Sequence, residues 1–218
     1  MHQLSEYSIY IFDCDGVILD SNELKIQAMR KALEQCHCKE DEIKGCLDYF
    51  KNNFGKSRFH HIKLFVDEFI ERDEVEVINL YNDLLEYYSN SCKKLYLTAE
   101  ITPAFLSFIG KLKGDKYIAS GSAQEELRDV FYLRGLSKYF NGIFGSPVKK
   151  TEIVNNIIIQ HDNAKIVMFG DAISDFEAST ANGIDFIGYI PYSNVADKIK
   201  EYSKKYNFPV IEEWNEII

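Results

Sequence analysis

Short apolar runs recur along the chain, and several of them are continuous rather than alternating with polar residues. They occupy residues 8–12, 116–119, 142–144, 165–169, 185–190 and 209–211. Parallel strands that helices cover on both faces have this composition. Segments of helical length lie between the later runs, at residues 102–112, 122–134, 151–161 and 174–182. The alternation of strand and helix predicts an open α/β sheet.

Two of these helices have recognisable start signals. Thr102 followed by Pro103 predicts an N-cap with proline in the first turn. Ser122, with Glu125 three positions later, has the spacing of a capping box. We therefore expect helices to begin at these two points.

The segment 21–94 differs from the rest of the chain. It contains no convincing strand, and charged residues of both signs are mixed along it. One apolar pattern in it has helical spacing, at Ile62, Phe65, Val66, Phe69 and Ile70. These features predict an all-helical insertion. Residues 1–20 and 95–218 would then form the core domain, and residues 21–94 the inserted one.

Composition and charge narrow the class of protein. Hydrophobic residues make up 46% of the 218 positions and charged residues 27%, as expected for a folded globular protein. The net charge of -9 and the isoelectric point near 5.1 argue against binding to nucleic acid or to an anionic membrane. No run approaches the roughly 20 apolar residues that a membrane-spanning helix needs.

The expected cellular location follows from two further features. Residues 1–8 lack the basic-then-apolar pattern of a secretory signal peptide. The cysteines are odd in number, which argues against a disulfide framework. They are Cys14, Cys36, Cys38, Cys46 and Cys92. We expect a cytoplasmic protein with reduced thiols.

The first apolar run ends at two acids, Asp13 and Asp15, which Gly16 follows. Ligands of open parallel sheets bind beyond the carboxyl ends of the strands, so both carboxylates can face one pocket. Gly16 lets the backbone turn sharply and approach a ligand. One carboxylate could act as a nucleophile while the other donates and accepts a proton. A polar strand end with an ordinary Asp-Gly turn remains open as the alternative.

Two later strand ends carry groups suited to an anion. The run at 116–119 leads into Ser120, Gly121 and Ser122, which offer hydroxyl and backbone N–H groups to a phosphate. Serine is also a common helix cap, so this signal is weak alone. Lys149 and Lys150 precede a helix start. Either lysine could neutralise a carboxylate–phosphate cluster or be solvated.

A further apolar strand ends in Gly170 and Asp171, with Asp175 four positions later. Mg²⁺ takes oxygen ligands and needs few protein carboxylates. Asp171 and Asp175 therefore indicate a Mg²⁺ site, although Asp175 alone would be ordinary on a helix.

Taken in order, the motifs DCDGV, YIAS, GSPVKK and GDAISD resemble those of the haloacid dehalogenase superfamily. The resemblance covers the whole chain and implies a Rossmann-like three-layer core with a parallel sheet. The helical insertion is similar to the C1-type cap of the branch that contains phosphoglycolate phosphatase and β-phosphoglucomutase.

The resemblance implies a role for each motif residue. Asp13 would be the nucleophile that forms an aspartyl-phosphate. Asp15 would protonate the leaving oxygen and then activate water. Ser120 would hold the transferring phosphoryl group, and Lys150 fits the lysine of the third motif better than Lys149. The backbone and hydroxyl groups around the substrate would come from Gly16, Gly121 and Ser122.

The metal site follows from the same resemblance. Mg²⁺ would be bound by Asp171, by the Asp13 carboxylate and by the Asp15 carbonyl, while Asp175 orients the metal shell or the lysine. The chemistry is coherent on physical grounds, because a carboxylate that attacks a phosphate dianion meets repulsion that Mg²⁺ and lysine reduce.

Three features of the insertion bear on the substrate. The loop that ends in Arg58 is similar to one in β-phosphoglucomutase that contacts a distal phosphate, so Arg58 could clamp a second anion or sugar oxygens. It could equally be a basic helix start. Lys25 stands where the mutase branch usually has a histidine, which weakens the mutase interpretation. Lys25 could meet a substrate anion or be solvated. Cys36, His37, Cys38 and Cys46 raise a zinc hypothesis, but their spacing is not that of a standard finger.

The function expected from the sequence is a Mg²⁺-dependent phosphatase that acts on a small phosphorylated metabolite, with a sugar phosphate favoured. We expect a monomer or a weak homodimer. A sugar-phosphate mutase and a non-catalytic phosphate-binding protein remain alternatives. Asp15 disfavours haloalkanoate dehalogenases and phosphonatases, which lack this second aspartate.

Overall fold

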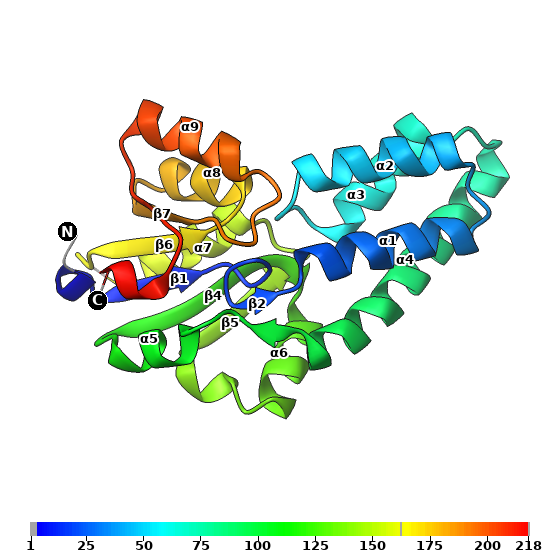
Figure 1. The fold of residues 1–218 in the computed structure, drawn as a ribbon. Coiled ribbons are helices and arrows are strands. Elements are labelled where there is room, and N and C mark those ends of the chain that lie inside the picture. The colour runs from blue at the N-terminus through cyan, green and yellow to red at the C-terminus, as the bar shows by residue number, and fades with distance from the viewer. Residues whose placement is uncertain (1–3, 162, 218) are drawn as a thin grey trace.

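Parallel strands form the central sheet of the protein, in the spatial order β5-β4-β1-β6-β7-β8 (Figure 1). The strands are β1 (Ile9–Phe12), β4 (Asp115–Ala123), β5 (Gly142–Ser146), β6 (Ile166–Gly170), β7 (Asp185–Tyr189) and β8 (Val210–Ile211). The computed structural model describes residues 4–161 and 163–217. Residues 1–3, which belong to the segment expected to lack a signal peptide, lie outside this range. The open parallel sheet is confirmed, and the ends of β4, β1 and β6 lie side by side.

Helices cover both faces of this sheet. Tyr10 and Phe12 of β1 belong to the core on one face, and Ile9 and Ile11 belong to the core on the other, as the pleat of a strand requires. The first face is covered by α5 (Phe105–Lys111) and α6 (Gln124–Leu133), the second by α7 (Lys150–Ile159), α8 (Ile173–Ala181) and α9 (Ala196–Tyr206) (Figure 1). Short helical turns are η1 (Leu4–Glu6), η3 (Ser137–Tyr139) and η4 (Trp214–Ile217). The expected three-layer α/β core is confirmed.

Both predicted helix starts are wrong, because tertiary contacts take the side chains elsewhere. Helix α5 begins at Phe105 after Ala104, and the Thr102 hydroxyl donates to the Val17 carbonyl at 2.7 Å. Strand β4 continues to Ala123, so α6 begins at Gln124. The hydroxyl expected in the capping box, that of Ser122, donates instead to Asp15 at 2.9 Å.

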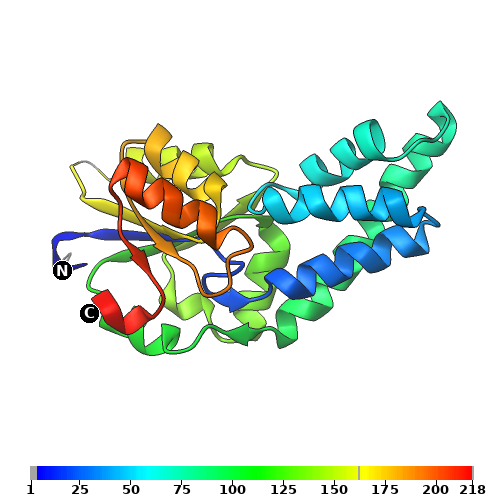
Figure 2. The same ribbon diagram turned by 45° about the horizontal axis from the view of Figure 1, so that its top comes forward.

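The insertion is built of helices that extend away from the sheet (Figures 1 and 2). They are α1 (Asn22–Gln35), α2 (Glu40–Asn52), α3 (Arg58–Leu64), the π-helical turn η2 (Phe65–Phe69) and α4 (Glu74–Thr98). We call residues 22–98 the cap. A small antiparallel pair, β2 (Leu19–Asp20) and β3 (Glu100–Ile101), joins the two ends of the cap to the core. The division into two domains stays a prediction.

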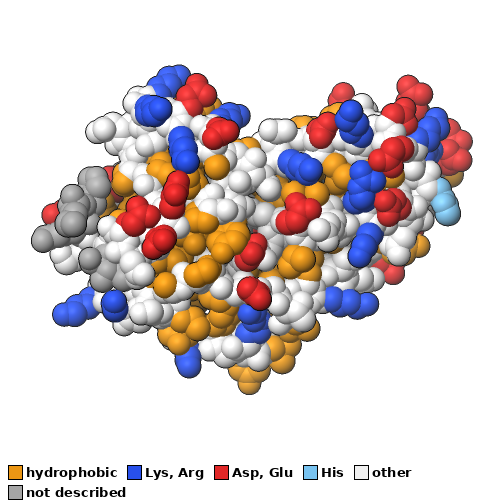
Figure 3. Space-filling model, viewed as in Figure 1, with side chains coloured by type: hydrophobic (Ala, Val, Ile, Leu, Met, Phe, Trp, Pro, Cys, Tyr) orange, Lys and Arg blue, Asp and Glu red, His pale blue; other side chains and the backbone are white. Residues whose placement is uncertain are grey.

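The surface of the cap carries both signs of charge. Figure 3 shows Lys and Arg interspersed with Asp and Glu over its outer face. The mixture is typical of a solvated surface and indicates no large single-sign patch for a polyanion on this side. In the described part of the chain, no helix combines the length and the apolar character that crossing a bilayer requires.

Candidate active site

Three neighbouring strands bring the predicted acids and serines together. Asp13 directly follows β1, and its backbone N–H donates to the Phe169 carbonyl of β6 at 2.9 Å. Ser120 lies near the end of β4, and Asp171 directly follows β6. All three side chains are buried. The parallel order β4-β1-β6 therefore gathers residues that are far apart in the sequence at one edge of the sheet.

Lys150 connects two of the acids. It is the first residue of α7, and its Nζ donates to Asp13 Oδ1 at 2.9 Å and to Asp175 Oδ1. Burial by itself lowers the pKa of this ammonium, but the two carboxylates outweigh it and hold the pKa above its usual value. Lys149 is exposed. The lysine that lies in the cluster is thus Lys150.

Asp175 is fixed from its other side. Its Oδ2 accepts from the backbone N–H groups of Asp171 at 3.1 Å and Ala172 at 3.0 Å. A Cβ on Gly170 would lie 2.2 Å from the Asp175 Cβ, so the strand end has room only for glycine. Together these contacts hold Asp175 against the turn that carries Asp171.

The same acids lie close enough together to hold one metal ion. Carboxylate oxygens of Asp13, Asp171 and Asp175 all lie within 4.8 Å of one another. Burial, opposed by Lys150, raises the pKa of Asp13 to about 7, and burial beside Asp13 raises the pKa of Asp171 well above its usual value. A divalent cation would reverse both shifts. Hard oxygen donors in this arrangement fit Mg²⁺.

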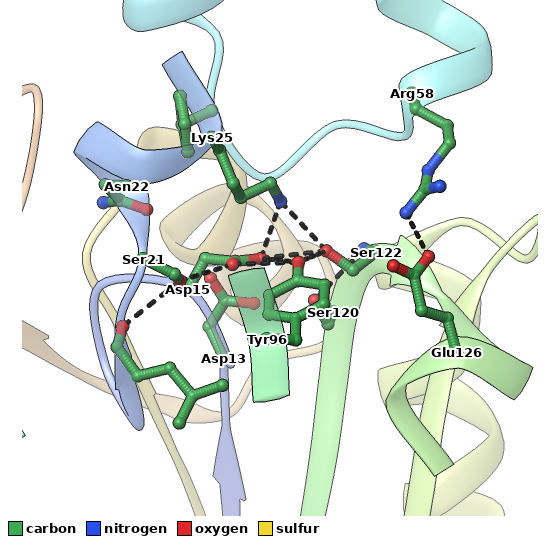
Figure 4. Close-up of polar contacts among 12 residues, drawn as sticks. Asp13, Asp15, Ser21, Asn22, Lys25, Arg58, Tyr96, Ser120, Ser122 and Glu126 are labelled. Carbon is green, nitrogen blue, oxygen red and sulfur yellow. Dashed lines mark hydrogen bonds and ion pairs between the residues drawn. The ribbon is translucent and has the colours of Figure 1, made fainter. Parts of the chain in front are cut away.

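Asp15 lies in a second group that faces the cap (Figure 4). Its carboxylate accepts from Ser21 Oγ at 2.6 Å, Lys25 Nζ at 2.8 Å and Ser122 Oγ at 2.9 Å, and the Tyr96 hydroxyl is 3.0 Å away. Burial alone would raise the pKa of Asp15, but the Lys25 charge and these hydrogen bonds hold it below its usual range. The two acids of the first motif therefore have different surroundings.

The predicted phosphate-side residues surround these groups. Ser120 Oγ accepts from the Ser122 backbone N–H at 3.1 Å. Gly16 has φ +74, and a Cβ there would lie 2.4 Å from Asp171 Oδ2, so the turn between the two acids needs glycine. A Cβ on Gly121 would lie 2.3 Å from the Gly55 carbonyl oxygen. At Gly121 the cap loop therefore touches the core.

Arg58 is paired with a residue of the core. Its guanidinium donates to Glu126 Oε2 of α6 at 2.5 Å, and both side chains are 5% exposed. Figure 4 shows this pair beside the Ser122 end of β4. Arg58 is therefore not a solvated helix start, and its charge is already balanced.

Sequence reasoning missed several residues of the site. Ser21 and Asn22 follow the first motif, and Asn22 Nδ2 donates to Asp171 Oδ2 at 2.7 Å. The sequence signal that could have identified Ser21 and Asn22 was their polar character directly after the first motif, at the start of the cap. Tyr96 and Glu126 gave no signal, because their partners lie in distant segments.

Cys36, Cys38 and Cys46 of the cap were candidate zinc ligands. All five cysteines of the chain are free thiols, and Cys36 and Cys38 are only half-buried. Among the described residues, the group that could hold a metal consists of the three acids and includes no cysteine. The zinc hypothesis gains no support.

Comparison with known proteins places the chain in a family. Residues 10–189 match the family described as haloacid dehalogenase-like hydrolase, which spans most of the chain. The protein belongs to the haloacid dehalogenase-like hydrolase family. The predicted superfamily is thereby confirmed. A search of curated proteins finds no significant match.

Solved structures share the fold. A predicted phosphatase from Clostridium acetobutylicum is 18% identical with a TM-score of 0.74, over 97% of this chain and 96% of that one. A predicted phosphoglycolate phosphatase from Haemophilus somnus is 15% identical with a TM-score of 0.67, over 90% and 98%. CbbY from Rhodobacter sphaeroides, in complex with xylulose 1,5-bisphosphate, is 12% identical with a TM-score of 0.68, over 95% of each chain. At these identities the likeness shows the fold alone.

Proposed function

We propose that the protein is a Mg²⁺-dependent phosphatase that hydrolyses a small phosphorylated metabolite, such as a sugar phosphate, through an aspartyl-phosphate. The observation that carries the proposal is the pair of inequivalent acids. Asp13 lies with Lys150 and two further carboxylates, whereas Asp15 lies 2.8 Å from Lys25 in a group of hydroxyls. The surroundings of Asp13 suit a nucleophile beside a cation site. Those of Asp15 suit a group that gives and takes a proton.

The first half-reaction uses both groups. An Asp13 carboxylate oxygen attacks phosphorus, and the bond from phosphorus to the leaving oxygen breaks. The leaving oxygen takes a proton from the Asp15–Lys25 pair. Lys150 stabilises the charge near Asp13, and the Ser120 hydroxyl, which the Ser122 backbone N–H holds in place, and the backbone N–H of Gly121 can orient the phosphoryl oxygens.

The second half-reaction restores the starting state. Water attacks the aspartyl-phosphate, gives one proton to the Asp15–Lys25 pair and releases inorganic phosphate. The pair therefore carries the same number of protons before and after a turnover.

Mg²⁺ would be held by the carboxylates of Asp13 and Asp171 and by the Asp15 carbonyl, with Asp175 orienting the shell. When bound, it supplies electrostatic stabilisation of the phosphoryl oxygens. The donor set supports this assignment, since every candidate ligand is an oxygen of a buried residue.

The test is phosphate release by purified protein from a panel of phosphomonoesters, with Mg²⁺ or with a chelator. We expect turnover with Mg²⁺ and its loss with the chelator. Asp13→Asn should abolish turnover, by about 10⁴-fold or more, because it removes the nucleophile. Its thermal unfolding should stay close to that of the wild type. Near-normal turnover by Asp13→Asn would rule out the assigned nucleophile.

The same panel tests the alternatives. A mutase would interconvert phosphate isomers after priming with a bisphosphate and release little phosphate. A binding protein would do neither. The expected small-metabolite partner, the monomeric or weakly dimeric state and the cytoplasmic location stay predictions.

A further inference from the structure

A cavity between cap and core lies beside the Asp15 group, next to Lys25 and Ser122. Its lining includes Lys25 and Ser122, which both donate to Asp15, and also Phe54, Arg58, His61 and Tyr88. Its volume is about 10 Å³, which is room for about one water molecule. If the proposed function holds, the leaving group of the substrate lies in this space after the cap opens to admit it.

Both buried cations of the cavity already have carboxylate partners. Lys25 is 2.8 Å from Asp15, and their side chains are 12% and 7% exposed. Arg58 is 2.5 Å from Glu126, at 5% exposure each. Two ion pairs therefore adjoin the cavity through Lys25 and Arg58, and these pairs add no net charge to it. A second anion on the substrate would have to displace Glu126 from Arg58 and leave that carboxylate buried without a partner.

Lys56 does not change this balance. It lines the cavity but is exposed, and its Nζ donates to Asn53 Oδ1 at 3.1 Å. Water solvates this exposed ammonium, so its attraction for an anion in the cavity is weaker than that of a buried, unpaired cation.

Two buried polar atoms, one in the cavity lining and one on the residue that pairs with Arg58 beside it, have no partner among the described residues. They are Glu126 Oε1 and His61 Nδ1, and their residues are 7% and 1% exposed. In Figure 4 the second oxygen of Glu126 lies toward Ser122. A ligand hydroxyl can donate a hydrogen bond to the Glu126 oxygen. Because a hydroxyl both donates and accepts, it can also pair with a nitrogen of a neutral imidazole. Burial lowers the pKa of His61 well below its usual value, so the ring is neutral.

We propose that the leaving group is a short uncharged polyol, whose hydroxyls pair with Glu126 and His61, and that Glu126 excludes substrates with a second anionic group. The inference rests on the proposed function, because it assigns the leaving-group side of the same site. It assigns Arg58 to a fixed ion pair rather than to a distal phosphate or carboxylate.

The experiment compares substrates matched in length. Glycerol 3-phosphate is paired with 3-phosphoglycerate, and 2-hydroxyethyl phosphate with 2-phosphoglycolate, so each pair exchanges a hydroxymethyl group for a carboxylate. We expect wild-type kcat/KM to favour the neutral member of each pair by at least about tenfold. Glu126→Gln, which frees the Arg58 charge, should shrink or invert that preference. Glu125→Gln, at an exposed neighbouring position, should leave it unchanged.

Binding to Asp13→Asn protein, measured by calorimetry with the same four compounds, gives the ranking without turnover. Tighter binding of the neutral members supports the inference even if wild-type protein releases no phosphate from any ester, a result that would defeat the proposed function alone. Equal or tighter binding of the anionic members overturns the inference. The inference is also overturned if wild-type protein shows no preference and Glu126→Gln lowers kcat/KM equally for both compounds of a pair.

Discussion

At the scale of single residues, the buried charges of the site form two hydrogen-bonded groups that share no lysine. Lys150 connects Asp13 to Asp175, and Lys25 contacts Asp15. Each ammonium compensates carboxylates that would otherwise be buried at a large cost in free energy. The groups therefore hold the fold together locally as well as preparing the chemistry. Removing one lysine should affect both properties.

The first prediction concerns Lys150→Met. Loss of the ammonium leaves three acids buried together, so we expect metal-free protein to lose about 3–5 kcal/mol of unfolding free energy. Mg²⁺ should restore part of this loss, because a divalent cation binds the same oxygens. Turnover should fall by about 10²–10³-fold at saturating Mg²⁺. Denaturant unfolding with and without Mg²⁺, together with phosphate release, measures both effects.

Lys149→Met is the matched control, since that side chain is exposed one position earlier. It should change the unfolding free energy by less than about 0.5 kcal/mol. Equal effects of the two substitutions would contradict the separate placement of the two lysines.

At the scale of elements, the sheet and the strand-end acids were predictable and the cap contacts were not. Continuous apolar runs specify buried parallel strands, and the chain order of the motifs then places Asp13 and Asp171 at one edge. Tyr96 reaches Asp15 across 81 positions, at the end of the long helix α4. Its position depends on how the whole cap packs. Thr102 and Ser122 failed as caps for the same reason, because their hydroxyls have tertiary partners.

The next prediction tests the contact between the cap loop and β4. A methyl group on Gly121 would lie 2.3 Å from the Gly55 carbonyl oxygen, a distance that forces the loop away from the core. Gly121→Ala should therefore raise KM and lower kcat together, by about tenfold or more in kcat/KM. Because the clash can be relieved by moving the loop, thermal unfolding of the core should change little.

Gly110→Ala serves as the control. Its added Cβ would meet nothing within 4 Å, and it lies in helix α5. Alanine favours a helix over glycine by up to about 1 kcal/mol, so this variant should keep its activity and be equally or slightly more stable. Unchanged kinetics in Gly121→Ala would show that the closed loop position is not needed for turnover.

At the scale of the whole molecule, the contacts between the cap and the core lie next to the residues of the site. Asn22 of the cap donates to Asp171, Ser174 of the core donates to the Phe54 carbonyl at 3.1 Å, and Arg58 pairs with Glu126. These contacts join the cap to core residues that neighbour both hydrogen-bonded groups of the site. The 10 Å³ cavity between the two parts is too small for a sugar phosphate. A larger pocket of about 360 Å³ reaches Lys150 and Gly121 from the cap loop, so we expect only the contacts of the cap around the smaller cavity to separate when a leaving group enters it.

The buried histidine at this junction makes the stability of the assembled molecule depend on pH. Burial, with His60 and two lysines nearby, lowers the pKa of His61 well below its usual value. Below about pH 6.5 the unfolded chain binds a proton at His61 that the folded chain does not, so acid favours unfolding. This contribution should weaken the fold by up to about 1.4 kcal/mol for each pH unit below about 6.5.

Denaturant unfolding between about pH 7.5 and pH 5.5 should show a shallower acid decline of the unfolding free energy in His61→Gln than in wild type. Burial also lowers the pKa of the more exposed His60, so His60→Gln should make the decline shallower as well, but by less than His61→Gln does. Equal slopes for wild type and His61→Gln would mean that His61 is not held neutral, and the hydroxyl-binding environment inferred for the cavity would lose one of its two polar atoms.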